Sequence, residues 1–166
     1  AKIWDAMGVD YINVNCGLQM TSFYNREPPS FKQGWKRDLA TSVKAVVKCP
    51  VIAVNTIKKP DFAVSLLEDG VSVFVGLTRG HIADPRWLQK VAEGREDEIR
   101  ICISCLNCMH TAVQGIQPTC TVNPAFGREY EFLNMKKNGN GRPVAVIGGG
   151  PAGMEASRIL AARGFK

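Results

Sequence analysis

The chain has 166 residues, of which 45% are hydrophobic and 22% charged, a composition typical of a globular protein in water. No apolar run approaches the roughly 18 residues of a membrane span. The net charge of +6 is scattered rather than gathered on a basic face interleaved with aromatic residues. We therefore expect neither a membrane nor a nucleic acid as a partner. Four of the six cysteines are clustered, which favours metal ligation in a reducing compartment over disulfides and predicts a cytoplasmic protein.

Between residues 1 and 98, short β-branched runs alternate with helical stretches. The predicted strands are residues 11–16, 51–55 and 71–75, and the predicted helices are residues 39–47, 60–68 and 84–94. The last helix is expected to start with Asp84 as its N-cap and Pro85 at its first position. Strands that alternate with helices predict an α/β fold with a parallel sheet, and both an open doubly wound sheet and a barrel fit the pattern.

Ligand sites in both of these folds form at the C-terminal ends of the strands. Two predicted loops lie there, residues 55–57 and residues 76–80. The second loop places Arg79 between Gly76 and Gly80, just past a strand end. Backbone N–H groups with one guanidinium can hold a phosphate group. The alternative is that Arg79 pairs with a neighbouring carboxylate.

The cysteines follow in the spacing C-x2-C-x2-C-x11-C, formed by Cys102, Cys105, Cys108 and Cys120. Three thiolates in one loop, closed by a fourth farther along, are typical ligands of a 4Fe-4S cluster. A structural zinc site usually pairs two separated C-x2-C groups or combines Cys with His. The spacing therefore predicts a 4Fe-4S cluster, with a zinc site or no metal as the alternatives.

A glycine-rich motif follows in the last 25 residues. Residues 143–147 form a short apolar run that predicts a buried parallel strand, and residues 154–163 are rich in helix formers. Between them lies G-x-G-x-x-G, in the strand–turn–helix context that a dinucleotide fingerprint requires. Gly148 would make the tight turn, Gly150 would admit a pyrophosphate, and Gly153 would let the helix pack on the strand.

This motif predicts that the chain is a piece of a longer protein. The fingerprint's acidic residue is expected about 20 residues farther on, but Lys166 follows Gly153 by only 13 residues. Ala1 in place of an initiator Met points the same way. We expect the chain by itself to be poorly soluble and inactive, because part of a parallel sheet would leave edges and apolar faces uncovered.

Three segments in this order resemble one protein family. They are residues 77–85 (LTRGHIADP), residues 99–124 with the cysteines, and residues 144–154 (VAVIGGGPAGM). The chain resembles the iron–sulfur flavoenzyme branch of the old yellow enzyme family, which includes 2,4-dienoyl-CoA reductase, enoate reductases, bile-acid-inducible NADH:flavin oxidoreductases and trimethylamine dehydrogenase. The resemblance implies the C-terminal part of an FMN-binding (β/α)8 TIM barrel in residues 1–98. It implies a cluster loop and linker in residues 99–141, and the start of a Rossmann-like FAD/NAD(P)-binding domain in residues 142–166.

The resemblance also implies site residues. The family's FMN contacts correspond to Asn55, Thr56, Thr78 and Arg79, and its dinucleotide contacts to Gly148, Gly150, Ala152 and Gly153. The four cysteines would hold the 4Fe-4S cluster. Some members carry a catalytic His after the strand that corresponds to residues 11–16, but the loop here, residues 17–20, has none. No catalytic residue is therefore assigned.

The implied activity is that of an NAD(P)H-dependent ene reductase, in the enzyme class EC 1.3. Electrons would pass from NAD(P)H through FAD and the cluster to FMN, and then to an activated C=C bond. The implied substrate is a small enoate, enone or dienoyl thioester. The alternatives are an oxidoreductase of the amine-dehydrogenase type and a non-catalytic electron-transfer or metal-binding module.

Overall fold

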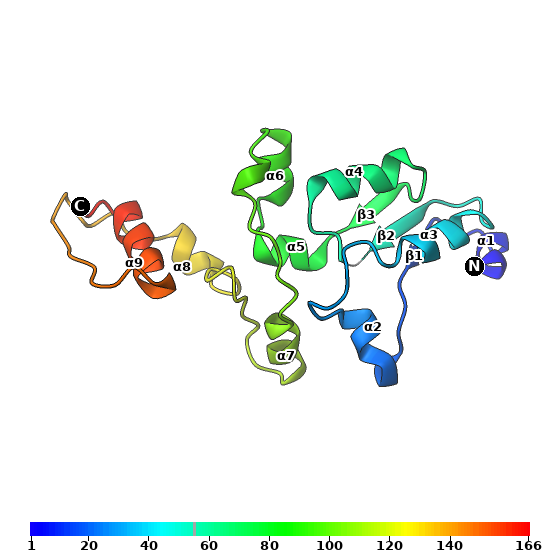
Figure 1. The fold of residues 1–166 in the computed structure, drawn as a ribbon, viewed down its shortest axis with the longest axis horizontal. Helices are drawn as coiled ribbons and strands as arrows, with labels where there is room; N and C mark the ends of the chain where they lie inside the picture. The colour runs from blue at the N-terminus through cyan, green and yellow to red at the C-terminus, as the bar shows by residue number, and fades with distance from the viewer. Residues whose placement is uncertain (55) are drawn as a thin grey trace. The chain divides into compact units, whose positions relative to one another are not determined.

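The computed structural model describes residues 1–54 and 56–166. The chain divides into two compact units, residues 1–127 and residues 128–166. Among the described residues, none of the helices combines the length and the apolar character that crossing a membrane would need. Figure 1 shows the elements of both units along the chain.

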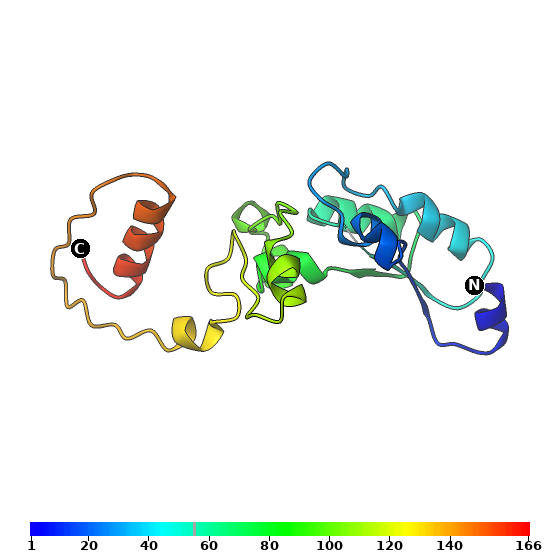
Figure 2. The ribbon, with the colours of Figure 1, turned by 90° about the horizontal axis from the view of Figure 1, so that it is seen from below.

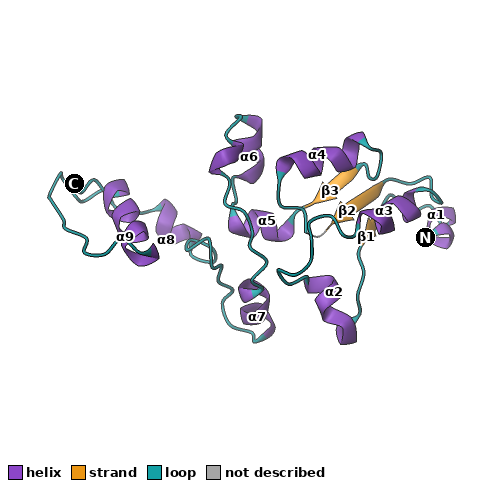
Figure 3. Cartoon of the chain, viewed as in Figure 1, coloured by secondary structure: helices purple, strands orange, loops and turns teal. Residues whose placement is uncertain are grey.

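The first unit contains a parallel sheet of three strands in the order β1-β2-β3. The strands are β1 (Ile12–Val14), β2 (Val51–Val54) and β3 (Phe74–Gly76). Figure 3 shows them side by side. In the register, Ile12 pairs with Val51 and Val54 with Gly76. The predicted α/β fold and its parallel sheet are confirmed, although the third strand begins three residues later than expected.

Helices join the strands in the way that parallel pairing requires. The α-helices of the first unit are α1 (Lys2–Ala6), α2 (Ser22–Arg26), α3 (Arg37–Lys44), α4 (Pro60–Glu68), α5 (Thr78–Ala83), α6 (Trp87–Ala92) and α7 (Asn107–Val113), with short 3-10 turns η1 (Gln19–Thr21) and η2 (Glu96–Glu98). The bounds of α4 are those predicted from its N-terminal Pro60 and from Gly70, which follows it with a φ of 67°.

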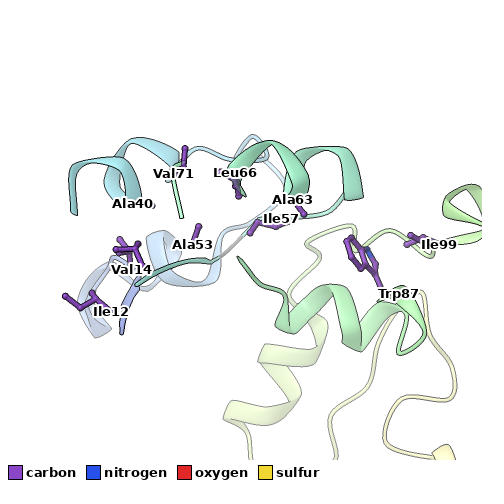
Figure 4. Packing of buried hydrophobic residues seen from close by; sticks show 11 residues of the cluster. Ile12, Val14, Ala40, Ala53, Ile57, Ala63, Leu66, Val71, Trp87 and Ile99 are labelled. Carbon is purple, nitrogen blue, oxygen red and sulfur yellow. The ribbon is translucent and has the colours of Figure 1, made fainter. Parts of the chain in front are cut away.

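Most of the core lies on one face of the sheet, beneath α3 and α4, and Trp87 of α6 and Ile99 extend it farther along the chain (Figure 4). Along β1, Ile12 and Val14 are buried and Asn13 is exposed, which is the period-2 alternation of a strand. Val51 and Leu66 are fully buried between the sheet and the helices. The opposite face of the sheet, which contains Asn13, lines a cleft.

The helix predicted over residues 84–94 is shorter, and its predicted cap is wrong. It is α6, which begins at Trp87 with Arg86 as its N-cap residue. Asp84 instead ends α5, a helix that the sequence did not predict. The carboxylate of Asp84 accepts hydrogen bonds from Lys90 Nζ at 2.6 Å and from the backbone N–H of Arg100 at 3.1 Å. Asp84 Oδ1 also accepts a hydrogen bond from the backbone N–H of Arg86 at 3.1 Å, so the carboxylate does bind the turn before α6, but the helix itself begins only at Trp87.

The second unit contains α8 (Glu129–Leu133) and α9 (Pro151–Ala162). Figure 2 shows the chain running from α8 through an extended segment into α9, with the C-terminus beside that segment. The strand predicted over residues 143–147 is wrong, since these residues form no strand and Ile147 is fully exposed. Val144 N–H donates to Lys166 O and Lys166 N–H donates to Arg142 O, which is the pattern of parallel pairing. One such pairing is too short to make a strand.

Candidate functional site

A cleft of about 450 Å³ lies at the C-terminal ends of the three strands. Its floor is the uncovered face of the sheet, with Asn13, Val54 and Phe74. Its rim contains the residues that follow β2 and β3, together with part of the cysteine loop. The rim residues are Thr56, Ile57, Lys58, Leu77, Thr78, Arg79, Gly80, Cys102 and Ser104. The structure therefore brings Thr56, Thr78 and Arg79 together, as predicted from the two loops, whereas Asn55 lies outside the described residues.

Thr56 is strained and buried at the rim of the cleft. Its φ of 50° lies in the left-handed region, which is a genuine outlier for a β-branched residue. The residue is 5% exposed, and its Oγ1 has no hydrogen-bond partner among the described residues. A buried hydroxyl without a partner costs about 1–3 kcal/mol. Strain and an unpaired hydroxyl at one residue point to a polar ligand in the cleft.

Arg79 is the second residue of α5 and pairs with a carboxylate, the alternative that the sequence left open. Its NH2 group donates to Glu27 Oε2 at 2.7 Å. Its NH1 group donates to the backbone carbonyls of Arg26 at 2.6 Å and Glu27 at 3.1 Å. The guanidinium is thus held by the C-terminal end of α2. Arg79 also lines the cleft, so its role towards a phosphate remains a proposal.

Sequence reasoning missed three charged residues of this region. Lys58 lines the cleft one residue beyond the predicted loop, and the position after a strand end was a signal that could have found it. Glu27 and Lys36 form a buried ion pair, with 3.0 Å between Oε1 and Nζ, and Glu27 also pairs with Arg79. Glu27 has a φ of 47°, but nothing in its local sequence predicts that conformation or its burial.

The four predicted ligand cysteines line one small cavity next to the cleft. Burial raises the pKa of the Cys108 thiol, and the nearby thiolates of Cys102 and Cys120 raise it further. Burial also raises the pKa of Cys105, but hydrogen bonds from Thr121 and from backbone amides outweigh it, so that the pKa falls. A thiol that is stabilised as the thiolate suits metal ligation.

No group of three or more His, Cys, Asp or Glu side chains in residues 1–54 and 56–166 is arranged to hold a metal ion. A single zinc ion needs its sulfurs close together, because each Zn–S bond is about 2.3 Å. In an iron–sulfur cluster each thiolate binds a different iron, which requires wider spacing. Four cysteines around one cavity fit the donor set of a cluster, and their role as its ligands remains a proposal.

Both ends of the cysteine loop are fastened to the C-terminal end of α5. Before the cysteines, the backbone N–H of Arg100 donates to Asp84. After them, Asn123 Nδ2 donates to Ile82 O at 2.8 Å, and Asn123 Oδ1 accepts from the Arg100 guanidinium at 3.2 Å. Asp84, Lys90 and Asn123 are all buried. We call Asp84, Lys90, Arg100 and Asn123 the α5 clamp. Since α5 starts at the rim of the cleft, the clamp ties the cysteine loop to the cleft.

The α5 clamp predicts a loss of stability in acid. Burial raises the pKa of Asp84, but hydrogen bonds from Lys90, Arg100 and Arg86 outweigh it and hold the pKa below its ordinary value of 3.8. A carboxyl whose folded-state pKa is depressed contributes stability that is complete above its unfolded-state pKa and is lost as pH falls through the folded-state pKa. We therefore expect urea denaturation of an Asp84→Asn variant to show less pH dependence below about pH 4 than the wild type does. Identical pH profiles would contradict this.

The glycines of the second unit have the geometry that the fingerprint needs at two positions. Gly148 has a φ of 108°, which favours glycine. A Cβ at Gly153 would lie 1.9 Å from the carbonyl oxygen of Gly148, so only glycine lets α9 approach the turn. Gly150 is the N-cap of α9, and a Cβ there would meet no protein atom within 4 Å. Ala152 lies exposed in the first turn of α9. The binding of a dinucleotide by these residues remains a proposal.

Comparison with known proteins identifies the class. A parallel α/β sheet with a cleft at its strand ends fits part of a TIM barrel. Residues 1–98 match the NADH:flavin oxidoreductase / NADH oxidase family, and the chain belongs to this family. This result confirms the family resemblance predicted from the sequence motifs.

Individual relatives agree with the family match. The chain is 43% identical to an NADH oxidase from Thermoanaerobacter brockii and 35% identical to a cinnamate reductase from Clostridium sporogenes, in both cases over its whole length. Its structure is similar to that of histamine dehydrogenase from Rhizobium sp. 4-9, with a TM-score of 0.86 and 31% identity over 99% of the chain. The chain spans 26%, 25% and 24% of the lengths of these three proteins, about a quarter in each case.

Proposed function

We propose that the chain contributes an FMN site and a 4Fe-4S site to an NAD(P)H-dependent oxidoreductase that reduces activated C=C bonds. The observation that carries the proposal is the position of Arg79, which lines both the cleft and the cysteine cavity. Two redox groups bound in these cavities would lie on either side of one side chain. FMN would supply hydride chemistry and the cluster would supply one-electron transfer.

The residues of the cleft suit the phosphate end of FMN. The Thr56 hydroxyl lacks a partner that a phosphate oxygen would provide. Lys58 and Arg79 line the same cleft, and none of the described lining residues is acidic. An anionic group is therefore attracted to this rim rather than repelled. Asn13 and Val54 on the sheet face would lie against the rest of the cofactor.

The proposed organisation follows the predicted boundaries. Residues 1–98 would form part of an FMN-binding TIM barrel, residues 99–141 the cluster loop and linker, and residues 142–166 the start of an FAD/NAD(P)-binding domain. The conformation of Gly148 and the close approach at Gly153 support the last assignment. The parallel pairing between the segment at Pro143 and Lys166 also supports it, because the chain returns beside its starting segment after one helix.

The substrate class is supported by relatives of two kinds. The cinnamate reductase supports a reductase of enoates, enones or dienoyl thioesters, in the enzyme class EC 1.3. The histamine dehydrogenase supports the alternative, an oxidoreductase that takes electrons from an amine.

An anaerobic assay of the whole protein separates the two functions. We expect NADH to bleach the flavin absorbance and a cinnamate-type enoate to restore it, with one NADH consumed for each enoate. Small methylated amines serve as the comparison set. Bleaching by an amine, with no oxidation by any enoate, would favour the amine-dehydrogenase type. Absence of a bound flavin would reject both.

A further inference from the structure

Glu27 is a buried carboxylate that the proposed function does not use. It is 0% exposed, and each of its oxygens is bonded to side chains from other elements. Oε1 accepts a hydrogen bond from Trp35 Nε1 at 2.9 Å and forms an ion pair with Lys36 Nζ at 3.0 Å. Oε2 accepts one from Arg79 NH2 at 2.7 Å. An isolated ionised carboxylate would be very costly at this depth, so the cationic partners are required.

The three charges of this cluster do not cancel. Lys36 and Arg79 carry two positive charges and Glu27 one negative charge, which leaves a net charge of +1. The side chains of Lys36 and Arg79 are only 4% and 16% exposed, so water screens the excess weakly. Of the three, Arg79 lines the cleft. An anion bound in the cleft would therefore neutralise the excess positive charge of this cluster.

The geometry also explains how Arg79 is oriented. Its two terminal nitrogens donate to the Glu27 carboxylate and to two backbone carbonyls at the C-terminal end of α2, which leaves the guanidinium little rotational freedom. Lys36 is held in turn by Asn15 Oδ1 at 2.8 Å. A cation that is already fixed loses less entropy when it binds a ligand than a mobile one does.

We propose that Glu27 is the positioning residue for anion recognition in the cleft: its carboxylate fixes Arg79, while Lys36 offsets its charge so that Arg79 still attracts an anion. The inference rests on the proposed function, with the FMN phosphate as the anion. It makes a distinctive prediction. Removing the negative charge of Glu27 should weaken phosphate recognition, although charge alone would strengthen it.

The test compares FMN with riboflavin, which has the same ring system but no phosphate. In the whole protein, stripped of flavin, we expect wild type to bind FMN more tightly than riboflavin. Glu27→Gln should lower the ratio of the two affinities by about tenfold or more, the loss expected when charge-assisted hydrogen bonds become misaligned. Glu68→Gln, at the exposed end of α4, is the matched control and should leave the ratio unchanged. A general disturbance of the fold would weaken both flavins alike and leave the ratio in place.

A double variant separates positioning from charge and avoids an unbalanced buried charge. Glu27→Gln with Lys36→Met keeps the net charge of +1 but leaves Arg79 without its carboxylate. We expect the ratio to stay low in the double variant. A ratio restored to the wild-type value would show that Arg79 recognises the anion without its carboxylate partner and would overturn the positioning role, as would a Glu27→Gln variant with an unchanged or increased ratio. A wild type with no preference for FMN would instead overturn the proposed FMN site.

Discussion

Replacing Cys105 by Ser is expected to remove the iron and acid-labile sulfide from the protein almost completely. Wild-type protein prepared without oxygen should contain about four of each per chain. Cys105 lines the cavity with the other three cysteines and is one of the four proposed ligands. A serine hydroxyl is a much poorer ligand for iron than a thiolate. Iron and sulfide analysis, with the visible absorption spectrum, measures the loss.

Cys16→Ser is the matched control for this prediction. Cys16 lies in the loop after β1 and its Sγ contacts Tyr24 O at 3.9 Å, outside the residues that line the cysteine cavity. The control should keep its full iron and sulfide content. Stoichiometric zinc without labile sulfide in the wild type would contradict the cluster and identify a structural zinc site. Wild-type protein without any metal would leave the cysteines with another role.

Replacing Asp84 by Ala is expected to lower the free energy of unfolding of the first unit by about 3–5 kcal/mol. The change leaves the Lys90 ammonium buried without its carboxylate, and it removes the acceptor of the Arg100 N–H. An uncompensated buried charge is among the costliest defects that a single substitution makes. Urea denaturation of the whole protein measures the effect as a shift of the transition midpoint.

Asp97→Ala is the control for the clamp, since Asp97 is an exposed acid in η2. It should change the free energy of unfolding by less than about 0.5 kcal/mol. The α5 clamp also predicts that Asp84→Ala loses its iron at a lower urea concentration than Asp97→Ala does, because the clamp holds both ends of the cysteine loop. A loss of stability below about 1 kcal/mol for Asp84→Ala would show that the buried pair is weakly coupled to the fold.

Some elements could be predicted from local sequence because their causes are local. Pro60 and Gly70 bracket α4, and β-branched runs mark β1 and β2. The spacing of Cys102, Cys105 and Cys108 is short enough for one loop to bring them to one cavity. The family resemblance rests on the same kind of contiguous pattern, and the match over residues 1–98 confirms it.

Other predictions failed where the outcome depends on neighbours. Residues 143–147 have the composition of a buried strand, but composition cannot supply the strands and helices that would pair with the run and cover it. Asp84 and Pro85 have the pattern of a helix start. The carboxylate accepts the local hydrogen bond from the Arg86 N–H, but it also binds Lys90 and Arg100, and α6 begins later, at Trp87.

By itself, the sequence determined the class of this protein, its parallel α/β pattern, and the cysteines and glycines that lie close together along the chain. Only the tertiary structure decided what Arg79 contacts, because its partner Glu27 lies 52 residues earlier. It also decided the clamp between Asn123 and Ile82, which are 41 residues apart. Burial makes such distant charged and polar groups depend on one another, since leaving a charged group unpaired inside the protein costs much free energy. Which groups are buried together depends on how the chain folds and not on local pattern.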